Sequence, residues 1–126
     1  MELCQRHDLV LIEDAAQAHG ANQNFDDGSK KAAGSMGDLS CFSFFPSKNM
    51  AVGGEGGMLA TTNEAYTAKL TAIINHGRSP ELHAMELGSN LRMSEVAAAI
   101  GLEQLNLLDT WVERRRQIAS RYSNAL

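Results

Sequence analysis

The sequence predicts an α/β fold, because short apolar runs in its first half give way to helical patterns in its second half. Residues 9–12 are continuously apolar, which is typical of a strand buried on both faces of a parallel sheet. Residues 39–45 and 58–62 are further strand candidates. With 126 residues, of which 44% are hydrophobic, the chain has enough apolar material for one core.

The strands and loops of the first half follow from local residue types. Residues 1–7 look like the tail of a helix, and the polar residues 22–35 predict an exposed loop or hairpin. Pro46 ends the middle strand, and the glycines at 53–57 require a turn. The middle and last strands are therefore expected to form a hairpin around the loop that contains Lys48.

Capping residues mark the helices of the second half. Thr62 or Asn63 is suited to begin a helix that Gly77 ends, and Ser94 begins another after an irregular stretch. Asp109 either begins a separate final helix or lies within one continuous helix. The apolar face of this region consists of Ala97, Gly101, Leu105, Leu108 and Val112, which recur at helical spacing.

Composition and charge exclude several classes of function. Fifteen acidic residues against eleven basic ones give a net charge of −4, and the only basic cluster, residues 114–116, lies in a helical segment. This charge distribution lacks the clustered basic residues that are typical of a nucleic-acid-binding surface. The two cysteines form no CxxC pair and the four histidines no HxxxH pair, so a zinc site is not expected. We expect a cytoplasmic protein, because no secretory or membrane-spanning segment is evident.

Two polar groups stand out beside the strands. A carboxylate at the end of a buried strand, such as Asp14, is unfavourable unless it is paired, and a protonated pyridine nitrogen is one possible partner. The alternative is that Asp14 caps the following turn. Lys48 follows an apolar strand, and a lysine in a partly dry cleft can form a Schiff base. The alternative is an ordinary surface lysine. The glycines at 53–57 match neither a dinucleotide fingerprint nor a P-loop.

Several motifs in a fixed order make the pattern specific. They are EDAAQAHG (13–20), GSMGD (34–38), FSFFPSK (42–48), GEGG (54–57), NHG (75–77), GSNLRMS (88–94) and AAAIGLEQL (97–105). Along essentially the whole chain, this order resembles the DegT/DnrJ/EryC1/StrS family of pyridoxal 5'-phosphate (PLP)-dependent sugar aminotransferases.

The resemblance implies a fold and a set of site residues. The fold is the large domain of the aspartate aminotransferase type (fold type I), in a homodimer with active sites at the subunit interface. Lys48 stands at the position of the Schiff-base lysine, Asp14 at that of the acid beside the pyridinium nitrogen, and Gln17 at that of the residue near the ring hydroxyl. Ser43 matches a phosphate ligand, and Asn90 matches an asparagine that reaches the phosphate of the partner subunit's cofactor.

The implied reaction is transfer of an amino group from an amino acid, glutamate in most of the family, to a nucleotide-linked keto-sugar. A sugar dehydratase is disfavoured, because Lys48 stands where such relatives have histidine. Residues 1–126 match only a middle segment of the family pattern and are expected to be a partial large domain. A non-catalytic role as a structural or regulatory partner is therefore the alternative. His19 and His76 are expected to be packed or loop residues outside the site.

Overall fold

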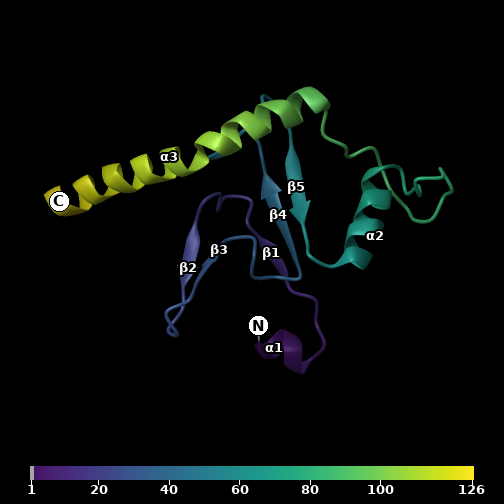
Figure 1. Ribbon diagram of the computed structural model, residues 1–126, viewed down its shortest axis with the longest axis horizontal. Coiled ribbons are helices and arrows are strands. Elements are labelled where there is room, and N and C mark those ends of the chain that lie inside the picture. Colours follow the sequence, from purple (N-terminus) through teal and green to yellow (C-terminus); the bar gives the residue numbers. More distant parts are fainter. Residues whose placement is uncertain (1) are drawn as a thin grey trace.

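In the computed structural model, which describes residues 2–126, three strands form one sheet, with a hairpin and three helices beside it (Figure 1). The helices are α1 (Glu2–Arg6), α2 (Glu64–Ile74) and α3 (Glu95–Ala125). The strands are β1 (Ile12–Asp14), β2 (Asn22–Asn24), β3 (Lys30–Ala32), β4 (Leu39–Ser43) and β5 (Gly57–Ala60). The sheet order is β1-β4-β5, in which β1 is parallel and β5 antiparallel to β4. The predicted α/β class is confirmed.

The first strand differs from its prediction. The ladder begins at Ile12, where the apolar run ends, although the N–H of Leu11 still donates to Asp38 Oδ2 at 2.7 Å. The expected burial on both faces is wrong, because the side chains of Leu9, Val10 and Ile12 are 58%, 51% and 63% exposed. β1 has a partner strand on one side only, and no helix within residues 2–126 covers these side chains.

The two predicted hairpins are both present. β2 and β3 pair antiparallel within the polar stretch, and their turn is closed by a bond from the N–H of Phe25 to Ser29 O at 2.9 Å. β4 and β5 pair antiparallel on either side of the loop that contains Lys48. The glycine turn ends where β5 begins, at Gly57.

The predicted helix caps are also present. Asn63 Oδ1 accepts the N–H of Ala65 at 2.9 Å at the start of α2, and Gly77 lies in the left-handed region (φ +71°) just beyond its end. Ser94 Oγ accepts the N–H of Ala97 at 3.2 Å at the start of α3. α3 is one continuous helix of 31 residues, which decides between the two alternatives left open by the sequence.

The core lies between the loop after β4 and the N-terminal half of α3. Phe44, Met50, Val52 and Leu108 are its buried members. Leu105, expected on the same face, is 53% exposed, so that part of the prediction is wrong. The C-terminal half of α3 extends away from the sheet, and its residues from 113 onward are exposed (Figure 1). No helix in residues 2–126 combines the length and apolarity needed to cross a membrane.

Candidate active site

Asp14 and Ser43 lie at the same edge of the sheet. They end the parallel strands β1 and β4, in which Asp14 is the register partner of Cys41, two residues before Ser43. Carboxyl ends of adjacent parallel strands are where open α/β sheets bind ligands. Asp14 Oδ1 accepts the N–H of Ala16 at 3.0 Å, so one oxygen of Asp14 caps the following turn, which was the alternative role considered for this residue. Oδ2 has no hydrogen-bond partner among the described residues.

Lys48 follows Ser43 in a short turn at this edge. The turn is closed by a bond from the backbone N–H of Lys48 to Phe45 O at 2.9 Å, and Ser43 Oγ accepts the N–H of Phe45 at 3.3 Å. The Lys48 side chain is half-buried, and no carboxylate within residues 2–126 forms an ion pair with it. The structure thus places a partly desolvated amine near the ends of β1 and β4.

His19 lies beneath this edge and is a neighbour that sequence reasoning left out. Its ring is 5% exposed and lies 5.6 Å from the Phe42 ring and 5.8 Å from the Phe44 ring, between centroids. Within residues 2–126, neither ring nitrogen has a partner with hydrogen-bonding geometry. Burial lowers the pKa of His19, the Ser43 backbone partly offsets this, and the positive charge of Lys48 lowers it further. The packing expected for His19 is confirmed, and the imidazole is held neutral next to the lysine.

The other two predicted site residues are less closely placed. Gln17 is exposed in the turn between Asp14 and His19 and makes no side-chain hydrogen bond with the described residues. Asn90 is exposed beyond the end of α2, where it forms a bridge with Asn75 and its Oδ1 accepts Arg92 Nε at 3.0 Å. The hydrogen bond and the bridge that Asn90 forms within residues 2–126 are to Arg92 and Asn75, and neither involves Lys48. The structure therefore brings the Asp14, Ser43 and Lys48 segments to one edge and leaves Asn90 apart.

Glu13 is a structural residue of the site that sequence reasoning missed. Its Oε1 accepts the N–H of Gly34 at 2.6 Å and its Oε2 that of Met36 at 3.0 Å. These bonds tie the end of β1 to the segment that leads into β4. The only sequence signal was a second acid next to Asp14, because the bonded residues lie more than twenty positions away.

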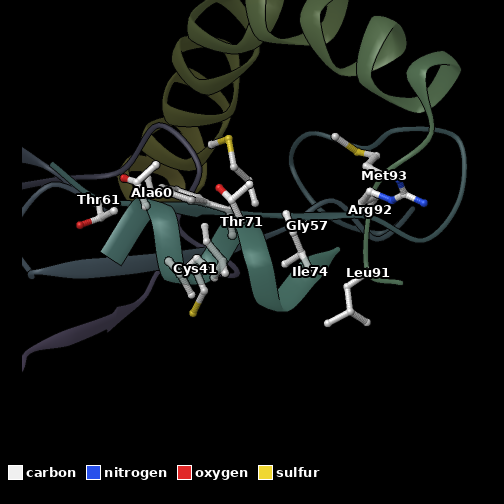
Figure 2. Close-up of a pocket in the computed structure, with 14 residues that line it drawn as sticks. Cys41, Gly57, Ala60, Thr61, Thr71, Ile74, Leu91, Arg92 and Met93 are labelled. Carbon is white, nitrogen blue, oxygen red and sulfur yellow. The ribbon is translucent and has the colours of Figure 1, made fainter. Parts of the chain in front are cut away.

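A separate hollow of about 670 Å³ lies between the strands β4 and β5 and the helix α2. It is bounded by these strands, by α2 and by residues 91–93, and Figure 2 shows Thr61 at one end and Leu91 and Arg92 at the other. Its lining is mostly apolar and includes none of the predicted site residues. The predicted site residues therefore gather at the sheet edge and not in this hollow.

Comparison with known proteins identifies the family. The sequence model of the DegT/DnrJ/EryC1/StrS aminotransferase family matches residues 1–126, and the chain belongs to this family. It is 40% identical over 124 residues to a pleiotropic regulatory protein of Geobacillus stearothermophilus, covering 98% of this chain and 32% of that protein. It is also 40% identical over 126 residues to the UDP-N-acetyl-3-dehydro-alpha-D-glucosamine 3-aminotransferase of Acidithiobacillus ferrooxidans, covering 100% of this chain and 33% of that enzyme.

A solved structure agrees with the sequence relatives. The crystal structure of a DegT DnrJ EryC1 StrS aminotransferase from Brucella abortus matches with a TM-score of 0.88 and 32% identity, over 99% of this chain and 32% of that chain. The chain thus spans about a third of the length of its relatives. The resemblance and the expected fold, a segment of the PLP-dependent transferase fold, are confirmed.

The residues at the sheet edge fit the cofactor of this family. PLP is bound in a solved relative, and it presents a pyridine nitrogen, a phosphate and a carbonyl carbon. The chain has residue types suited to these groups, which are the exposed carboxylate of Asp14, whose Oδ2 has no partner among residues 2–126, the hydroxyl of Ser43 and the half-buried amine of Lys48. The unpartnered nitrogens of His19 mark this region as one whose polar groups are incompletely satisfied. The donor set therefore fits PLP.

Proposed function

We propose that residues 1–126 form the lysine-bearing part of the large domain of a PLP-dependent sugar aminotransferase, with Lys48 as the residue that carries the cofactor. The observation that carries this proposal is the arrangement of the ends of β1 and β4, which hold Asp14 and Ser43, beside a half-buried Lys48 that has no counter-ion among residues 2–126. The name of the Acidithiobacillus ferrooxidans relative supports a nucleotide-linked keto-sugar as the amino acceptor. Glutamate is the proposed amino donor.

Each residue has a distinct role in the proposed chemistry. PLP, when bound, supplies an electron sink for charge that develops on the amino donor. Asp14 would hold the proton on the ring nitrogen, Gln17 would orient the ring hydroxyl and Ser43 would bind the phosphate. Lys48, released as a free amine, would move a proton as general acid and base. The half-buried position of Lys48, without an ion-pair partner among residues 2–126, supports this role.

The proposal extends to a cytoplasmic homodimer. Asn90 would reach the phosphate of the cofactor in a second subunit, and its exposure leaves it accessible for such a contact. The apolar side chains exposed beside β1 also favour association with further protein surface. Size-exclusion chromatography with light scattering checks this part, and a monomer at all concentrations would contradict it.

The central test is reductive trapping of the cofactor. The purified chain is incubated with PLP, reduced with borohydride and analysed by peptide mass spectrometry. We expect the pyridoxyl group mainly on Lys48 and its loss in Lys48→Arg, with Lys69→Arg as the control. Equal labelling of all four lysines would contradict the proposal, because a built site must distinguish Lys48 from exposed lysines.

A non-catalytic role is the second candidate. It is favoured by the name of the Geobacillus stearothermophilus relative, a pleiotropic regulatory protein. Unselective labelling of lysines together with a folded chain, seen by circular dichroism, is the result that this candidate predicts.

A further inference from the structure

Helix α3 contacts both segments that carry the proposed site. In its C-terminal half, Arg116 Nη2 donates to Gly20 O at 3.2 Å, and the Val112 side chain fills the space where a Cβ on Gly20 would lie. Gly20 ends the segment that follows Asp14 and contains Gln17. Nearer its start, Gln104 Oε1 accepts the backbone N–H of Ala51 at 2.8 Å. Helix α3 thus contacts both the segment that follows Asp14 and the loop that contains Lys48.

The Gln104 contact holds the lysine loop on the C-terminal side of Lys48. Phe44, the residue that follows β4, also ties this loop, because its N–H donates to Gly56 O at 2.8 Å and its carbonyl accepts the N–H of Val52 at 3.4 Å. Ala51 directly precedes Val52, three residues after Lys48, and its N–H donates to the helix instead of a strand. The Gln104 side chain is therefore the partner that fixes the loop at this point.

The helix backbone lies close enough to the loop for this bond to be short. A Cβ added at Gly101 would lie 3.1 Å from Val52 Cγ1 and 3.6 Å from Met50 Cε. Glycine at this position therefore allows α3 to rest on Met50 and Val52, both buried in the core. Gln104 lies one turn further along the helix, where an amide oxygen reaches the Ala51 N–H. Apolar packing and one polar bond together hold the loop.

We propose that Gln104 is a positioning residue for Lys48, acting through its hydrogen bond to Ala51. This inference rests on the proposed function, since it takes Lys48 as the residue that carries the cofactor. Loss of the Gln104 oxygen leaves the Ala51 N–H without a partner, and the loop then samples positions in which the Lys48 amine is more solvated and less well directed. The predicted defect is local to the lysine loop.

Two measurements on the full chain test this role. Amide hydrogen exchange followed by NMR is expected to be about tenfold faster at Ala51 in Gln104→Leu, as for a lost hydrogen bond of ordinary strength, with no change in the β4 amides. After incubation with PLP and borohydride, the share of adduct on Lys48 relative to the other three lysines is expected to fall several-fold. Gln104→Glu retains an acceptor oxygen and is expected to restore both values.

The control is Gln117→Leu on the same helix, where Nε2 donates to Glu113 Oε1 at 3.2 Å and no loop is contacted. Unchanged Ala51 exchange in Gln104→Leu overturns the inference, and so does equal acceleration in β4, which indicates general destabilisation. A Lys48 preference that survives the loss of Gln104 overturns the positioning role alone. A wild-type chain without any preference for Lys48 overturns the proposed cofactor site, while the exchange data still report on the loop.

Discussion

Replacing Glu13 with glutamine tests how firmly the end of β1 is tied to the segment before β4. Both carboxylate oxygens accept backbone N–H groups, from Gly34 at 2.6 Å and from Met36 at 3.0 Å, in a partly buried setting. An amide has one acceptor oxygen, so in Glu13→Gln one N–H faces an NH₂ group and loses its partner. Charge-assisted bonds of this kind contribute about 1.5 to 3 kcal/mol each.

The expected loss of unfolding free energy is therefore about 2 to 3 kcal/mol, since one bond is lost and the other is no longer charge-assisted. Urea unfolding followed by circular dichroism is the assay. With a slope of about 1 to 2 kcal/mol per molar urea for a chain of this size, the midpoint is expected to fall by about 1 to 3 M. Glu103→Gln, at an exposed position on α3, is the matched control and is expected to leave the midpoint in place.

A midpoint for Glu13→Gln that coincides with that of the control would refute the reasoning. It would mean that water satisfies the Gly34 and Met36 N–H groups at no net cost, and that the Glu13 carboxylate does not contribute to the free energy of unfolding. A changed slope would instead mean that the two proteins do not unfold between comparable states.

Three further perturbations probe packing, capping and protonation. Gly34→Ala is expected to cost about 2 to 4 kcal/mol of unfolding free energy, because φ is +88° and the new Cβ would overlap the Phe42 ring. Ser94→Ala removes the N-cap of α3 and is expected to cost about 1 kcal/mol, measured by urea unfolding. His19 has a lowered pKa, so the stability that its burial provides is complete above its ordinary value of 6.5 and decreases as pH falls below it. Urea midpoints of wild type and His19→Gln, taken from pH 7.5 to 5, check this.

Each of these has its own control and its own contradicting result. Gly28→Ala has similar backbone strain (φ +81°) but open space around the new Cβ, and a loss as large as that of Gly34→Ala would contradict the overlap argument. Ser123→Ala lies near the exposed end of α3, and an equal effect there would show that capping is not the cause. For His19, the pH dependence must shrink in His19→Gln, with His83→Gln as the control, and identical profiles would contradict the assignment.

Local residue chemistry was enough to predict much of the fold. Asn63 and Ser94 mark helix starts because their side chains satisfy free N–H groups nearby, an interaction that needs no knowledge of the rest of the chain. The exposure of Leu9 and Leu105 could not be predicted in this way. An apolar side chain shows that it can be buried, but whether another element covers it depends on contacts that are distant in sequence.

The same limit applies to the site. Asp14 and Lys48 could be singled out because each ends or follows a strand, whereas Ser43, Gln17 and Asn90 were named only through the resemblance to the family. Glu13 and Gln104 could not, because a carboxylate or an amide on a partly exposed position is ordinary until its partner is known. For Gln104 that partner lies 53 residues away in the sequence.

The continuous helix α3 has a mechanical consequence. Its contact with Gly20 at Arg116 lies between the loop contact at Gln104 and the projecting end at Ala125. At a rise of about 1.5 Å per residue, the two arms on either side of this contact measure about 18 and 14 Å. No residue of the shorter arm is buried, so a contact made there would reach the loop that bears Lys48 only through the helix itself, which the packing of Leu108 in the core also holds.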